Sequence, residues 1–126
     1  MLKGIGIDVV YLDVIKTMVE ARSGEALRDI FTDAEIDLCQ SSPNMMERFA
    51  TRFAAKEAAM KALGVGWQAD GLDWTDIEVT NDDANKPSLT LKGEAELKAK
   101  ELGVQKVWLS LTHEENVGLA LVVLEG

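Results

Sequence analysis

One alanine-rich, basic stretch decides the fold of this chain, and it runs Arg52-Phe53-Ala54-Ala55-Lys56-Glu57-Ala58-Ala59-Met60-Lys61-Ala62-Leu63-Gly64. Strong helix formers fill it, and a glycine is a typical residue at the end of a helix. At 3.6 residues per turn, the apolar stripe that holds Phe49 and Met60 also holds Glu57. Burying a charged carboxylate is costly unless it is paired or binds a metal. We therefore predict either a functional carboxylate or a helix edge at which Glu57 reaches water.

The chain has the size and composition of one soluble domain. Its 126 residues suffice for a single hydrophobic core, so we expect one domain over residues 1–126. No apolar run is long enough to span a membrane, and the N-terminus lacks the features of a signal peptide. The single cysteine, Cys39, excludes an internal disulfide framework and makes a cytoplasmic location the expectation. We expect Cys39 to fill space in a helix.

The charge distribution points to one basic element in an acidic protein. A net charge of -9 argues against nucleic acid as a partner. Segment 44–64 is nevertheless net positive, and it leaves two interpretations of Glu57 open. Either Glu57 and Lys61 form a surface ion pair worth about 0.3–0.5 kcal/mol, or they belong to an anion-binding face.

The order of expected elements predicts an α+β fold, with an antiparallel-rich sheet packed against the long helix. Thr32 and Glu35 match a capping box for the third helix, and Ser42 with Pro43 is expected to begin the long helix. Glycines in the first strand allow a close approach of another element. The expected strands are residues 2–8, 74–80, 88–91, 106–113 and 117–124, and the expected helices are residues 9–19, 25–30, 33–40, 43–63 and 92–102.

Two further residues are candidates for chemistry. Asp8 ends the first expected strand, where it either faces a cleft or caps the next helix, and the residues alone favour the cap. His113 is the only histidine, and a lone histidine is more often structural than functional.

Taken together, the carboxylates of Asp8 and Glu57 suit Mg²⁺ and a phosphorylated ligand, because Mg²⁺ is commonly held by one or two carboxylates plus phosphates. Three basic side chains of the long helix are expected to neutralise such phosphates, namely Arg52, Lys56 and Lys61.

Three blocks of sequence, in this order, resemble the holo-[acyl-carrier-protein] synthases, the short bacterial class of the 4′-phosphopantetheinyl transferase superfamily. The blocks are residues 4–8, residues 52–64, and residues 110–113 followed by an apolar last strand. The resemblance covers essentially the whole chain and implies the 4′-phosphopantetheinyl transferase fold. It also implies a homotrimer whose active sites lie at subunit interfaces.

The resemblance implies a reaction. Coenzyme A donates its 4′-phosphopantetheine arm to a serine of an apo acyl carrier protein, with Mg²⁺ as cofactor and release of adenosine 3′,5′-bisphosphate, in fatty acid or polyketide biosynthesis. The implied metal ligands are Asp8 and Glu57, and either Glu57 or a metal-bound water is the base. The implied catalytic residues are Glu57, Lys61 and His113. The positions expected to bind coenzyme A are Arg52, Lys56, Lys61, Gly64, Lys86, Pro87 and His113.

The sequence also departs from the family pattern. The first helix carries Asp13 and Val14 where Lys or Arg usually docks the acidic carrier, so Arg22, Arg28 and Arg48 are the remaining docking candidates. Asn85 replaces a glycine, and we expect the turn to survive because asparagine tolerates the left-handed conformation. Trp67-Gln68 is expected to alter the mouth of the pocket. A catalytically silent module that binds coenzyme A or a carrier protein is the competing prediction.

Overall fold

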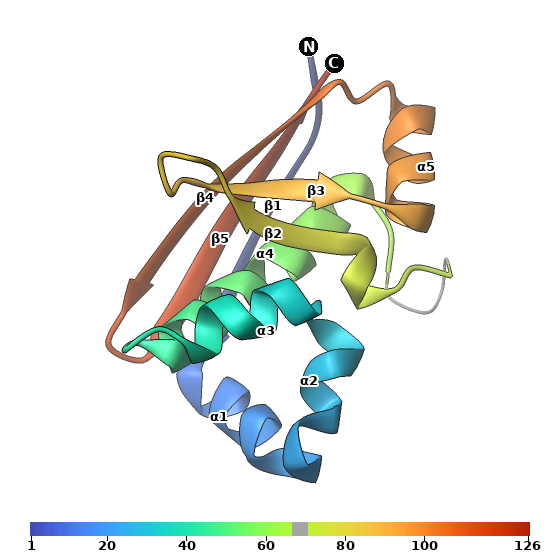
Figure 1. Ribbon diagram of the computed structural model, residues 1–126. Helices are drawn as coiled ribbons and strands as arrows, with labels where there is room; N and C mark the ends of the chain where they lie inside the picture. Colours follow the sequence, from blue (N-terminus) through green and yellow to red (C-terminus); the bar gives the residue numbers. More distant parts are fainter. Residues whose placement is uncertain (67–70) are drawn as a thin grey trace.

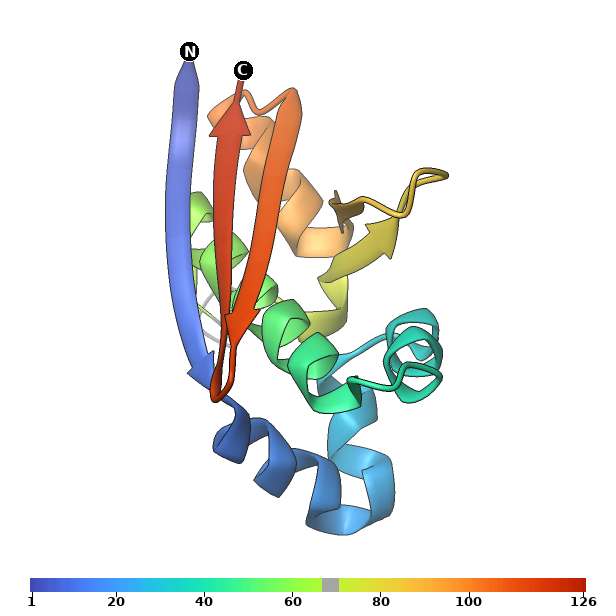
Figure 2. The ribbon, with the colours of Figure 1, turned by 90° about the vertical axis from the view of Figure 1, so that its left-hand side faces the viewer.

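The computed structural model describes residues 1–66 and 71–126, and it describes their side chains except those of Arg22 and Ser23. Its centre is a three-stranded antiparallel sheet in the order β1 (Leu2–Tyr11), β5 (Val117–Glu125) and β4 (Lys106–Glu114). Helix α4 (Met45–Leu63) packs across one face of this sheet, against β1 and β5 (Figures 1 and 2). The opposite face is uncovered in the part of the chain that the structure describes (Figure 2). The α+β prediction is therefore confirmed.

Small residues allow α4 to lie directly on the sheet. A methyl group at Gly6 would overlap the carbonyl oxygen of Ala58, and one at Gly118 would lie 2.9 Å from the Cβ of Ala50. Ala120, the next inward residue of β5 after Gly118, is fully buried. The close approach expected from the glycines of the first strand is thus confirmed, and it brings side chains of β1 against those of α4.

Three short helices and a 3₁₀ turn connect β1 to α4. They are α1 (Leu12–Glu20), η1 (Ala21–Gly24), α2 (Glu25–Ile30) and α3 (Asp33–Gln40). The predicted capping box is present, because the Glu35 backbone N–H donates to Thr32 Oγ1 and the Thr32 N–H donates to Glu35 Oε1. Cys39 is fully buried in α3, and burial raises the pKa of its thiol to about 11, which fits the predicted space-filling role.

A hairpin follows α4 and lies across it (Figure 1). After η2 (Trp74–Asp76), strands β2 (Ile77–Asn81) and β3 (Pro87–Leu91) pair antiparallel, and α5 (Gly93–Leu102) leads back to β4. β2 contacts α3 and α4, and β3 contacts β4. Asn85 in the turn has φ 63°, so the expected left-handed conformation is confirmed.

Several predicted boundaries were wrong. Residues 74–76 are expected in a strand but form η2, so β2 begins at Ile77. β1 extends through Tyr11, which pairs with Val117, so Asp8 lies inside a strand and does not cap a helix. Helix α4 begins at Met45 with Asn44 at the N-cap position. Ser42 does not cap α4, because its hydroxyl donates to a carbonyl of the preceding helix α3.

The described residues share one hydrophobic core, which lies between the sheet, α4 and the hairpin. Among these residues, no helix is long and apolar enough to cross a membrane.

Candidate functional site

Asp8 projects from β1 toward the C-terminal half of α4 and meets Lys61 there. Asp8 Oδ1 accepts a hydrogen bond from Lys61 Nζ at 3.1 Å, and the same ammonium donates to the Ile7 carbonyl oxygen at 3.1 Å. The second oxygen, Asp8 Oδ2, is buried and has no hydrogen-bond partner among the described residues. An unpaired carboxylate oxygen away from water is unfavourable, and a cation would satisfy it.

Glu57 belongs to α4, lies beside Asp8 of β1 and is half-buried. Burial and then the neighbouring Asp8 carboxylate raise the pKa of Glu57, while Lys61 opposes the shift. The Lys61 ammonium makes its ion pair with Asp8, so the alternative of an isolated Glu57–Lys61 pair does not describe this region. Two adjacent carboxylates repel each other, and a divalent cation between them would relieve that repulsion.

The donor set fits Mg²⁺ bound jointly with a phosphorylated ligand. Within residues 1–66 and 71–126, no group of three or more His, Cys, Asp or Glu residues could hold a metal ion by itself. Mg²⁺ seldom uses an all-protein cage and usually takes one or two carboxylates, substrate phosphates and water. Asp8 and Glu57 are the residues that would hold it here.

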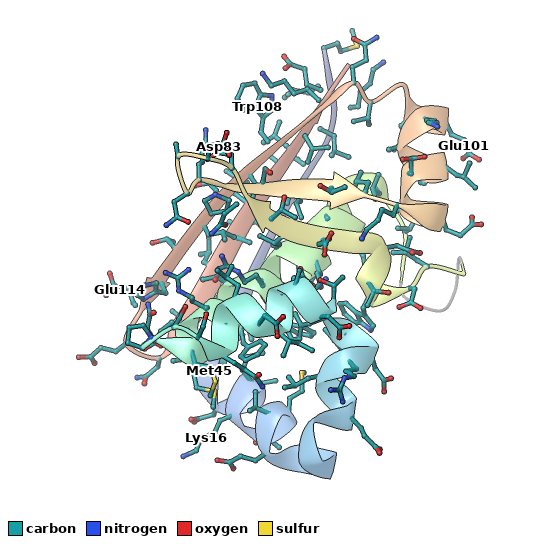
Figure 3. All side chains as sticks on the ribbon, viewed as in Figure 1. Lys16, Met45, Asp83, Glu101, Trp108 and Glu114 are labelled. Atoms are coloured by element: carbon teal, nitrogen blue, oxygen red, sulfur yellow. The ribbon has the colours of Figure 1, made fainter. Side chains whose placement is uncertain are left out.

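A cavity of about 240 Å³ lies between the N-terminal half of α4, the β2–β3 hairpin and the end of β4. Figure 3 labels Asp83 in the hairpin turn and Glu114 at the end of β4, which lie on the same side of the molecule. The cavity is lined by Asn44, Glu47, Arg48, Thr51, Arg52, Asn81, Asn85, Pro87, Leu111, Thr112 and His113. Three of these were expected to bind the nucleotide: Arg52, Pro87 and His113.

Arg52 gives this cavity the character of an anion site. Its side chain is 4% exposed, and Nη1 donates to Thr51 Oγ1 at 3.2 Å. Its Nε is buried and has no partner among the described residues, and burial lowers the pKa of the guanidinium. A buried cation with an unused donor suits a phosphate, which guanidinium groups bind in bidentate fashion.

Within one chain, the carboxylates and the cavity lie on opposite sides of the central strand β5. Asp8 of β1 and Leu111 of β4 both pair with Ala120, so their backbones lie two strand spacings, about 10 Å, apart. The cavity lining includes neither carboxylate and neither Lys61 nor Gly64. Gly64 ends α4 with φ 73°, at the end of the helix that carries Glu57 and Lys61. The predicted site residues therefore form two groups.

Two of the predicted binding residues lie elsewhere. Lys86 is exposed and lines a separate cavity of about 260 Å³ together with Lys106 and Trp108. Lys56 is completely buried and pairs with Glu35 at 2.8 Å on the side of α4 that faces α3 and β2. Because the Lys56 ammonium is enclosed by protein groups, we correct its predicted role and leave it out of the ligand site.

Sequence reasoning missed several cavity residues. Arg48 and Arg52 lie one turn apart on α4, and this spacing indicates a shared basic face, although Arg48 was considered only for docking. Asn81 and Asn85 come from a turn that carries no comparable pattern. Arg28 lines a different cavity, between α2 and α3. The Trp67-Gln68 pair lies outside the described residues.

Comparison with known proteins identifies the family of the chain. The chain belongs to the 4′-phosphopantetheinyl transferase superfamily, whose sequence model matches residues 4–122. It is 42% identical over 125 residues to the holo-[acyl-carrier-protein] synthase of Solibacter usitatus, covering 99% of both chains, and equally similar to that of Koribacter versatilis.

Solved structures of the same enzyme class share the fold. The Neisseria meningitidis holo-[acyl-carrier-protein] synthase is 31% identical with a TM-score of 0.88, and the alignment covers 100% of both chains. The Helicobacter pylori enzyme in complex with coenzyme A is also 31% identical, with a TM-score of 0.83 and coverage of 96% of this chain and 99% of that one.

Proposed function

We propose that this chain is a holo-[acyl-carrier-protein] synthase, which transfers the 4′-phosphopantetheine arm of coenzyme A to a serine of an apo acyl carrier protein. The observation that carries the proposal is the pair Asp8 and Glu57, with a buried, unpaired Asp8 oxygen beside Lys61. The family of the chain and the coenzyme A complex of the H. pylori relative support coenzyme A as the substrate at this pair.

The transfer exchanges one phosphorus–oxygen bond for another. The serine hydroxyl oxygen bonds to the pantetheine-side phosphorus, the bond from that phosphorus to the bridging oxygen breaks, and adenosine 3′,5′-bisphosphate leaves with that oxygen. The serine proton passes to a base, and we assign this role to Glu57, the half-buried carboxylate that lies beside Asp8. Lys61 lies beside Asp8 and donates to oxygens that gain charge on the leaving group.

Mg²⁺ held by Asp8 and Glu57 would orient the pyrophosphate and neutralise its charge. Arg52 and His113 line the cavity in which we place the nucleotide, with Arg52 bound to a phosphate. Pro87 forms the opposite wall and Lys86 lies next to it in the hairpin.

We further propose that a complete site needs two chains of a homotrimer. The carboxylates and the cavity are separated by β5 in one chain, so a coenzyme that contacts both groups is best served by neighbouring copies. The uncovered face of the sheet supports this assembly, because it exposes large apolar side chains, namely Ile5, Ile7, Val9, Tyr11 and Trp108. Analytical ultracentrifugation would measure the mass of the particle in solution, which should be that of three chains.

The acidic carrier is expected to dock with little long-range attraction. The chain carries a net charge of -9, and Asp13 and Val14 of α1 are exposed at the usual docking helix. Arg28 and Arg48 are the described basic candidates for this contact. The cytoplasmic location remains a prediction.

Mass spectrometry tests the proposal directly. Apo carrier proteins from several pathways are mixed with this chain, coenzyme A and Mg²⁺, and a carrier should gain the mass of phosphopantetheine. Chelation of the metal should stop the gain, and added Mg²⁺ should restore it. If the chain binds coenzyme A but modifies no carrier, it is the silent binding module instead.

A further inference from the structure

We infer that the buried pair of Lys56 and Glu35 is a positioning device that seats the β2–β3 hairpin against α4 and thereby sets the shape of the nucleotide cavity. The inference deepens the proposed function and rests on it, because it assigns the cavity to the nucleotide of coenzyme A. Neither side chain lines the cavity itself.

The pair is fully enclosed and its hydrogen-bonding capacity is used. Both side chains are 0% exposed, and Lys56 Nζ lies 2.8 Å from Glu35 Oε1. Lys56 Nζ also donates to the Trp74 carbonyl oxygen at 3.1 Å and to the Ile77 carbonyl oxygen. An ammonium has three donors, and these three acceptors use all of them.

Glu35 makes the complementary contacts. Its Oε2 accepts from the Val79 backbone N–H at 2.8 Å, and its Oε1 accepts from the Thr32 N–H at 2.9 Å. The pair therefore ties α3 and α4 to η2 and to two backbone groups of β2. At position 56, an apolar side chain has no N–H to donate to the Trp74 and Ile77 carbonyl oxygens.

This attachment point is close to the cavity wall. Val79 lies two residues before Asn81, and Asn81 pairs with Pro87 across the hairpin. Asn81, Asn85 and Pro87 form the hairpin side of the cavity, while Arg48 and Arg52 on α4 form the other. A change in how β2 sits on α4 therefore changes the distance between these two walls.

A second link flanks the first. Glu78, between the two anchored residues of β2, accepts from the Thr32 hydroxyl at 2.6 Å and from Lys92 Nζ at 3.1 Å. This link is at the surface of the hairpin, so it can hold β2 in the sheet after the buried pair is removed. We therefore expect a variant without the pair to fold with a displaced hairpin.

The test compares two double variants. Lys56→Met with Glu35→Gln removes both buried charges together, which avoids the unpaired charge that a single substitution leaves. Lys100→Met with Glu96→Gln makes the same changes in an exposed pair of α5, at 3.3 Å, away from the cavity. Thermal unfolding and sedimentation first establish that both variants fold and assemble like the wild type.

We expect the first variant to raise both the KM for coenzyme A and the Kd for adenosine 3′,5′-bisphosphate about tenfold or more, with kcat changed less than about threefold. Amide hydrogen exchange should speed up at Val79 and Asn81. The α5 variant should match the wild type in all four measurements.

The outcomes separate this inference from the function itself. A folded Lys56→Met, Glu35→Gln variant with wild-type KM, Kd and exchange rates would make the pair purely stabilising and overturn the inference. A lower kcat at unchanged KM would overturn it too. A wild-type chain that binds the bisphosphate but transfers nothing would refute the proposed function alone, and a wild-type chain that binds no bisphosphate would overturn both.

Discussion

Helix α4 carries two ion pairs on different faces, and they differ in burial and in hydrogen bonding. On the face toward α3 and β2, Lys56 and Glu35 are 0% exposed and have all their hydrogen bonds. On the face toward β1, Lys61 is 58% exposed, and its partner Asp8 keeps one buried oxygen unpaired.

We interpret this difference as the difference between a structural pair and a pair that is open to a ligand. A complete buried network leaves no atom for a ligand, whereas the Asp8–Lys61 pair keeps one acceptor without a partner, Asp8 Oδ2, beside a largely exposed ammonium. The neighbouring Glu57, with its raised pKa, adds a second carboxylate to the incomplete pair only. Burial and completeness of hydrogen bonding, not the type of residue, distinguish the two ion pairs.

The largest expected effect contrasts the two lysines in stability. Lys56→Met should lower the free energy of unfolding by about 3–5 kcal/mol, because it leaves a buried Glu35 charge without its partner. Lys61→Met should lower it less, because the Lys61 side chain is 58% exposed, although its partner Asp8 is only 10% exposed. Urea unfolding measures both, and equal losses would contradict the comparison.

The second prediction concerns catalysis, for which the side of α4 that faces β1 should matter most. Asp8→Asn and Glu57→Gln should each lower Mg²⁺-dependent transfer more than about 100-fold while the protein stays folded, because each removes a charge that holds the cation. Added Mg²⁺ with coenzyme A should raise the Tm of the wild type more than that of either variant. Glu94→Gln, an exposed acid on α5, serves as the control. Wild-type turnover in both variants would rule out the assignment of the metal ligands.

The third prediction concerns the contact that brings β1 to α4. Gly6→Ala places a methyl group against the Ala58 carbonyl oxygen, so the helix must move away from the strand that carries Asp8. We expect a loss of about 1–3 kcal/mol in the free energy of unfolding together with slower transfer. Thr90→Ala, at an exposed strand position, should change neither. A Gly6→Ala protein with full activity would show that the Asp8–Glu57 spacing does not depend on this contact.

The smallest expected effect is a pH dependence of the stabilisation by Glu78, which lies next to the buried pair of Lys56 and Glu35. The Thr32 hydroxyl, and then Lys92, lower the pKa of Glu78 below its ordinary value of 4.5. The ionised carboxylate therefore stabilises the fold above that value, and this stabilisation disappears as the pH falls through the folded-state pKa. Glu78→Gln should cost about 1 kcal/mol at pH 7 and progressively less below pH 4.5.

Unfolding of wild type and Glu78→Gln from pH 7 down to pH 3 checks this, with Glu101→Gln as an exposed control. A stability difference that stays constant over this range would contradict the assignment.

Local sequence was sufficient where the determining interactions are local. The capping box of Thr32 and Glu35 involves residues three positions apart, and Asn85 adopts its left-handed conformation within one turn, so both were predicted correctly. The start of α4 was not, because the Ser42 hydroxyl is used by the preceding helix, a competition that a capping pattern does not reveal.

By itself, the sequence determined the family, the α+β fold and the long helix, and it made Asp8 and Glu57 the candidate metal ligands, because these follow from ordered blocks and helical periodicity. Only the tertiary structure decided which lysine of the central motif faces inward. Helix α4 is buried on two sides, by the sheet and by the elements around β2, so its wheel shows no single polar face. The partner of Asp8 and the walls of the cavity depend on contacts between residues distant in the chain, such as Asp8 with Lys61 and Lys56 with Ile77. No local pattern encodes those contacts, because they arise only when separate elements pack together.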